Sequence, residues 1–164
     1  MITLEPLRGL EGNADAWRAL ELSRAGLSRF LRVAQAAVGL HGEVDVLLAG
    51  DRTLRRLNRE FRGKDKATDV LSFPAAGEIA NEFAGDLAIS LETARRQAIS
   101  HGHTLRDEVR VLLLHGLLHL HGMDHEVDGG EMAAKEAQLR TRLRLPDGLI
   151  ARVGTKAGKS KVAA

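Results

Sequence analysis

Residues 115–125, HGLLHLHGMDH, decide how the second half of this chain folds, and they hold four of its seven histidines. Apolar residues from Val111 to Leu118 surround the first of these histidines and predict a buried helix. We expect this helix to run from Leu105 to His121, with Thr104 as its N-cap. His115 and His119 are four residues apart, so a helix places both imidazoles on one face, where they can share a metal ion.

The residues that follow this helix offer a third ligand. Gly122 lies three residues beyond His119, where a left-handed conformation would end the helix and turn the chain back. The turn would let His125 supply a third nitrogen, whereas His121 points elsewhere and is interpreted as a partly exposed residue outside the site. Three neutral imidazoles with an open fourth position are typical of catalytic zinc, so we predict one Zn²⁺ ion, although other divalent metals remain open.

Gly116 separates this pattern from that of zinc peptidases. Their motif, H-E-x-x-H-x-x-G-x-x-H, has a glutamate as general base at the position of Gly116. A residue that cannot take a proton makes ordinary peptidase chemistry a poor fit. A phosphodiester is then a reasonable electrophile for a metal-activated water. The alternative, a chance gathering of surface or core histidines, is the weaker interpretation of such regular spacing.

The rest of the chain predicts an α+β fold, a small mixed β-sheet covered by helices. Pro6 confines the first strand to a sheet edge or ends it early. Gly39 and Gly63 end two helices, and Asp51 is placed to cap the second of them. We expect strands at residues 2–7, 43–50, 69–73 and 85–90, and helices at about 16–38, 51–61, 91–100, 105–121 and 130–144.

The composition indicates one soluble globular domain, residues 1–150, followed by a basic tail at residues 151–164. With no cysteine among 164 residues, a metal must be held by His, Asp or Glu. No stretch is long and apolar enough to span a membrane, and no secretion signal is visible, so we expect a cytoplasmic protein. The net charge of the chain is +2. The tail carries +4, through Arg152, Lys156, Lys159 and Lys161, so the rest of the chain carries −2. We expect this tail to be disordered, and a loose contact with RNA phosphates is its functional interpretation.

HGLLHLHGMDH, FRGKDKATDVLSFP at residues 61–74 and GDLAIS at residues 85–90 together resemble the bacterial YbeY family of metal-dependent endoribonucleases. The resemblance runs from about residue 43 to residue 145. It implies a zinc site of His115, His119 and His125, and single-strand-specific cleavage of RNA. It also implies maturation of the 3′ end of small-subunit (16S) rRNA and ribosome quality control. The implied partners are ribosomal RNA and the small ribosomal subunit or 70S ribosome, with neither DNA nor membrane.

The same resemblance assigns a functional role to Arg62, the arginine of the R-G-K-D-K segment. Its planar guanidinium suits a phosphate, but an arginine at a helix end also interacts with the last carbonyls. Family members usually have proline where this chain has Ala67, so the loop there is expected to be less rigid. Lys64 and Lys66 could extend a cationic path for RNA.

Several polar residues have a structural interpretation that we favour over a functional one. Asp124 could orient a ligand histidine but is more typical of a turn, and Asp86 could line the site but is more typical of a solvated strand entry. Met132 is expected in the core, and His101 and His103 in solvent. Two other functions remain open: a metal hydrolase acting on another bond, and a non-catalytic ribosome-assembly factor with a structural metal.

Overall fold

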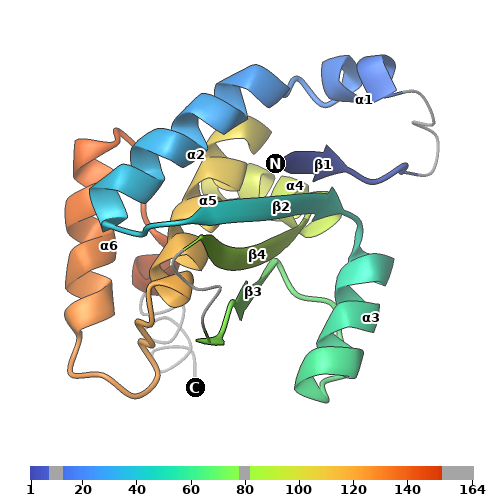
Figure 1. Cartoon of the computed structure of the whole chain (residues 1–164). Helices are drawn as coiled ribbons and strands as arrows, with labels where there is room; N and C mark the ends of the chain where they lie inside the picture. The colour runs from blue at the N-terminus through green and yellow to red at the C-terminus, as the bar shows by residue number, and fades with distance from the viewer. Residues whose placement is uncertain (8–12, 78–81, 153–164) are drawn as a thin grey trace, which may run out of the picture.

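The computed structural model describes residues 1–7, 13–77 and 82–152, and in these ranges a small sheet is flanked by helices (Figure 1). The predicted tail beyond Arg152 and residues 78–81 of the predicted loop before Gly85 lie outside the described residues. None of the described helices is both long and apolar enough to cross a membrane. The α+β class is confirmed.

The sheet has four strands in the order β1-β2-β4-β3. β1 pairs with β2, and β2 with β4, in parallel, whereas β3 runs antiparallel to β4, so the sheet is mixed as predicted. β1 lies at one edge, and it ends before Pro6, which could not donate to a ladder. The strands are β1 (Ile2–Leu4), β2 (Glu43–Ala49), β3 (Val70–Pro74) and β4 (Phe83–Ser90).

The helix α5 is the centre of the molecule, since it packs against β3, β4, α2, α4 and α6 (Figure 1). Its leucines join those of β2 and β4 in the main core on one face of the sheet. On the other face α3 buries Leu54 against Leu71 and Ala88. The helices are α1 (Asn13–Ala19), α2 (Arg24–Val38), α3 (Asp51–Arg62), α4 (Leu91–His101), α5 (Leu105–Leu120) and α6 (Glu131–Arg142).

The single helix predicted at residues 16–38 is wrong, because the chain forms two helices there. α1 ends at Ala19, Glu21 adopts a left-handed φ of 54°, and α2 starts anew after Ser23. The Ser23 hydroxyl accepts a hydrogen bond from the Gly26 amide at 3.0 Å, which is an N-cap that the apolar periodicity had hidden.

The helix ends mostly follow the prediction. Gly39 and Gly63 take left-handed conformations after α2 and α3, and the Thr104 hydroxyl caps α5 by accepting from the Asp107 amide. Asp51 is not the N-cap of α3, however, because Gly50 occupies that position and Asp51 is the first helical residue. The Asp51 carboxylate instead accepts hydrogen bonds from side chains of α4 and the residue before it, namely Ser90, Thr93 and Arg96.

The last described residues form a helical turn at 149–152, packed on the domain. Arg152, which the sequence placed in a solvated basic tail, is buried, with 6% of its surface exposed. Its guanidinium donates to Glu108 Oε1 and Oε2 at 2.7 and 2.6 Å. The first two residues of the predicted tail, Ala151 and Arg152, thus belong to a helical turn, and a buried carboxylate on α5 provides Arg152 with a partner.

Candidate metal centre

His115, His119 and His125 converge on one point next to the sheet. The first two lie one turn apart on α5, and the third follows the turn at the end of that helix. The possible ligand atoms of the three residues all lie within 4.8 Å of one another, and the Nε2 atoms of His115 and His119 are 3.1 Å apart. His115 is buried and the other two are half-buried. The three histidines that the sequence spacing predicted as metal ligands therefore lie together in the structure.

His115 is oriented by a carboxylate from another helix. Its Nδ1 atom lies 2.8 Å from Oε2 of Glu136, on α6. With the carboxylate as acceptor, Nδ1 carries the proton and donates it to this hydrogen bond, so the lone pair of Nε2 is directed at the other histidines. A carboxylate behind a histidine is a common arrangement at metal sites, where it fixes the tautomer of the ligand.

His119 is oriented by the backbone of the turn that follows α5. Its Nδ1 atom lies 3.0 Å from the carbonyl oxygen of Met123, which leaves Nε2 as the acceptor nitrogen. Gly122 has a φ of 92° and reverses the chain, as the sequence predicted. The reversal brings the Met123 carbonyl to His119. Burial, and next the nearby His115 and His125, lower the pKa of His119, so its neutral, ligating form is favoured.

His125 supplies a nitrogen that the described part of the protein leaves without a hydrogen bond. Its Nδ1 atom is buried and has no partner among the described residues. A buried polar atom of this kind normally costs about 1–3 kcal/mol, so it calls for a partner. A divalent cation held by three neutral imidazoles would satisfy it, and the donor set therefore fits a metal ion.

The position of the peptidase glutamate is closed by packing. α5 lies so near β4 that a Cβ atom on Gly116 would be 2.7 Å from Cδ2 and 3.1 Å from Cδ1 of Leu87. Leu87 is 1% exposed and has little room to move. The carbonyl of Gly116 also accepts a hydrogen bond from the Ser72 hydroxyl at 3.4 Å. The close contact between the helix and the sheet thus disfavours a side chain at position 116.

The three histidines open onto a cleft of about 690 Å³, which Arg62, Lys64 and Lys66 also line. Arg62, the last residue of α3, donates through Nη2 to the carbonyl of Ser72 in β3, and its guanidinium lies 5.9 Å from the ring centre of Phe73. This partner is a strand carbonyl, so the alternative of an arginine on the last carbonyls of its own helix is not the observed contact. The side chain is held over β3, in the same cleft as the histidines.

The other residues singled out by the sequence lie as follows. Asp124 lines the cleft and makes a turn, since its Oδ1 accepts from the Glu126 amide at 3.0 Å. Asp86 is exposed and lies in a separate hollow beside Asp45, where partial burial of its carboxyl group and the charge of Asp45 raise its pKa. Met132 is buried in the core as predicted. His121 is exposed and does not line the cleft.

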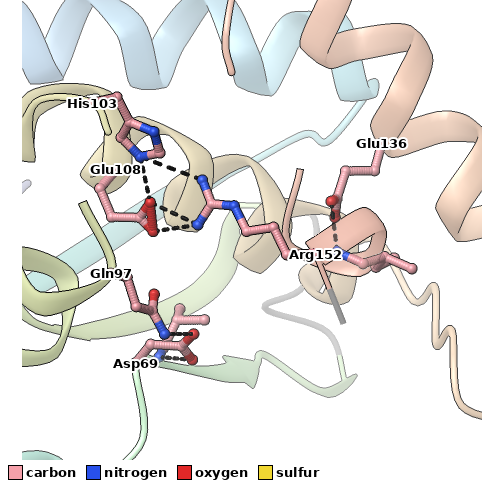
Figure 2. Close-up of polar contacts among 8 residues, drawn as sticks. Asp69, Gln97, His103, Glu108, Glu136 and Arg152 are labelled. Atoms are coloured by element: carbon pink, nitrogen blue, oxygen red, sulfur yellow. Dashed lines mark hydrogen bonds and ion pairs between the residues drawn. The ribbon is translucent and has the colours of Figure 1, made fainter. Parts of the chain in front are cut away.

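The prediction that both His101 and His103 face solvent is wrong for His103. Its Nε2 atom lies 2.7 Å from Oε1 of Glu108 and its side chain is only 11% exposed (Figure 2). Glu108 is fully buried and also holds Arg152, so the three residues form one polar cluster, and Arg152 itself lines the cleft. A glutamate within the first turns of α5 looks like an ordinary helix residue, and the sequence does not show that His103 and the distant Arg152 both meet it.

Glu136 was also missed, although a signal for it was present. It lies between Met132 and Leu139, and these three residues form the buried face of α6 at a spacing of four and three. A carboxylate on the apolar face of a helix requires a partner, and a nearby histidine cluster is a good source of one.

Comparisons with known proteins show what most of this chain is similar to. The sequence matches a family described as Endoribonuclease YbeY over residues 15–144. Proteins named Endoribonuclease YbeY from Koribacter versatilis and Solibacter usitatus are 52% and 54% identical, over 85% and 87% of this chain and 90% and 96% of their own. A solution structure of a Thermotoga maritima protein is similar with a TM-score of 0.50 and 25% identity, covering 87% of this chain and 89% of that one.

Proposed function

This chain belongs to the YbeY family of endoribonucleases, and from that premise we propose that it is a metal-dependent endoribonuclease that cuts single-stranded RNA. The observation that carries the proposal is the convergence of three imidazoles, two of them oriented by hydrogen bonds, and the Arg62 guanidinium on one cleft. The donor set suits a metal, and the cation suits a phosphate.

We propose that His115, His119 and His125 hold one Zn²⁺ ion. Three neutral nitrogen ligands suit zinc better than the oxygen-preferring Mg²⁺ or Ca²⁺, and they leave a coordination position for water or substrate. When bound, the ion would supply an activated water or polarise a phosphate oxygen. Glu136 and the Met123 carbonyl keep two of the imidazoles in the tautomer that ligation requires.

The proposed task of Arg62 is to bind the scissile phosphate and to balance the charge that develops on it. The guanidinium presents several donors in one plane, of which one is engaged by Ser72, and its exposed side chain leaves others for a ligand. Lys64 and Lys66, which line the same cleft, would hold neighbouring phosphates of the strand.

The proposed substrate is the precursor of small-subunit (16S) rRNA, cut to form its mature 3′ end, with a further role in ribosome quality control in the cytoplasm. The support is the family resemblance, together with a cleft whose cations match a polyanionic strand. The partners would be ribosomal RNA and the small ribosomal subunit or the 70S ribosome.

A peptidase is opposed by Gly116, because the position of the general base is filled by Leu87. A non-catalytic assembly factor with a structural metal is distinguished from the enzyme by experiment. Wild type loaded with zinc and a metal-free His119→Ala variant are incubated with precursor small-subunit rRNA in assembled particles. Cleavage by the wild type alone supports the proposal. Equal cleavage by both contradicts a metal-dependent reaction, and particle binding without cleavage by either favours the assembly factor.

A further inference from the structure

Glu136 joins the candidate metal centre to the C-terminal end of the described chain. Its Oε2 atom accepts from Nδ1 of His115 at 2.8 Å, and its Oε1 atom accepts from the backbone N–H of Ile150 at 3.0 Å. Both oxygens therefore act as acceptors, one on each side. The carboxylate thus lies between His115 on α5 and the backbone of Ile150, which is more than a dozen residues further along the chain than Glu136.

The surroundings of Glu136 leave it little freedom. It is 2% exposed, and a Cβ atom on Gly148 would collide with its carboxylate. Residues 148–152, which we call the C-terminal strap, thus pack directly on the Glu136 side chain. The absence of a side chain at Gly148 is what allows this close approach.

The C-terminal strap has a second anchor in the same core. Figure 2 shows Glu136 beside the strap, while Arg152 reaches the other way to Glu108 and His103. Arg152 and Glu108 are both buried, so separating the two charges would cost a large amount of free energy. The strap is therefore fixed at two points, one on the carboxylate of α6 and one on that of α5.

We propose that Glu136 is a positioning residue for His115, and that the C-terminal strap keeps Glu136 in place, so the affinity for metal depends on residues 148–152. This inference rests on the metal centre of the proposed function, but not on RNA cleavage. Loss of the carboxylate behind a ligand histidine typically weakens metal binding about 10–100-fold.

A glutamine at position 136 provides a sharp test, because a carboxamide has only one oxygen. If its NH₂ group faces His115, Nδ1 must accept and the ring carries its proton on Nε2, the atom directed at the site. If its NH₂ group faces Ile150 instead, two donors meet and the strap is released. Either arrangement lowers the affinity for metal, although the size and shape of the side chain are unchanged.

Zinc affinity is measured by competition with a chromogenic chelator, without RNA, on metal-free wild type and on Glu136→Gln. The expected result is a 10–100-fold weaker affinity for Glu136→Gln, with the unfolding midpoint of the metal-free protein reported alongside. Glu131→Gln, an exposed position on the same helix, is the matched control and should bind as wild type does. A folded Glu136→Gln protein with wild-type affinity overturns the proposal.

The strap is tested by a matched pair at position 150. Ile150→Pro removes the N–H that Glu136 accepts, and Ile150→Ala retains it. The first should bind zinc several-fold more weakly than the second, and equal affinities would overturn the role of the strap. ¹⁵N NMR of the metal-free wild type gives a reading that needs no variant: His115 should carry its proton on Nδ1, and a proton on Nε2 would overturn the proposal. A wild type that binds no zinc at all would instead reject the metal centre itself.

Discussion

The Nε2 atoms of His115 and His119 lie 3.1 Å apart, and each ring has its Nδ1 atom engaged by a separate acceptor. With both protons on Nδ1, two lone pairs face each other across the site. Such a contact is repulsive unless a cation or a proton lies between the rings, so the fold holds the pair in a geometry suited to a positive ion.

Removal of one ligand should therefore empty the site. We expect His119→Ala to lose stoichiometric zinc, measured as metal per protein by mass spectrometry after gel filtration. His121→Ala, two residues away but exposed and outside the cleft, is the control and should keep its metal. Full zinc content in His119→Ala would mean that the ion is held elsewhere.

Arg62→Ala should separate metal binding from cleavage. We expect zinc content to remain at the level of wild type and the cleavage rate to fall about 10²–10³-fold, as when one charge-stabilising donor is lost. Arg62→Lys should recover part of the loss, since it restores the charge without the planar donors. Arg56→Ala, exposed on the same helix and outside the cleft, should cut RNA like wild type. Unchanged cleavage by Arg62→Ala would leave Arg62 with only its contact to Ser72.

Because of the surroundings of the Asp51 carboxylate, we expect the stability of the folded protein to depend on pH. Burial acts to raise its pKa, but hydrogen bonds from Ser90, Thr93 and Arg96 outweigh this effect and hold the pKa below its usual value. A lowered pKa in the folded state contributes stability that is present above about pH 4 and is lost as the pH falls through the folded value. Asp51→Asn should thus lower the free energy of unfolding by about 1–2 kcal/mol at pH 7, and the difference should shrink below pH 4.

Urea unfolding at a series of pH values measures this difference. Asp147→Asn is the control, because that carboxylate is 79% exposed and its nearest cation is 3.9 Å away. A gap between wild type and Asp51→Asn that stays constant down to pH 3 would contradict the assignment.

Substitutions of Gly116 should not stabilise the protein, and the loss of stability should increase with the size and charge of the new side chain. Alanine improves the helix propensity by about 1 kcal/mol but forces Leu87 to move, which costs about 1–3 kcal/mol, so we expect no gain in stability. Glutamate adds a buried charge and should reduce the yield of folded protein severely, without peptidase activity. Thermal unfolding and a casein assay measure both effects. A stable Gly116→Glu protein would show that α5 can move away from β4.

The candidate site was predictable where it depends on local spacing. The pair His115 and His119 needs only a helix, and His125 needs only the turn that Gly122 allows. The same is true of Gly39 and Gly63, because a helix that ends in a left-handed residue selects glycine by local sterics.

The rest depends on residues that meet only after folding. Glu136 on α6 contacts His115 on α5, and Arg152 contacts Glu108, which lies 44 residues earlier in the chain. Asp51 looked like an N-cap because the sequence could not show that Ser90 and Thr93 would compete for its carboxylate. The break at Glu21 was hidden for a related reason, since apolar residues continue on both sides of it.

The contact between Gly116 and Leu87 also bears on how such proteins can change over time. A codon change that introduced glutamate at position 116 would meet the side chain of a strand residue before it could reach any substrate. A smaller residue at position 87 would have to come first, and that change by itself leaves a void in the core without offering a new activity. The route from this site to a peptidase therefore passes through a less stable intermediate with no immediate benefit.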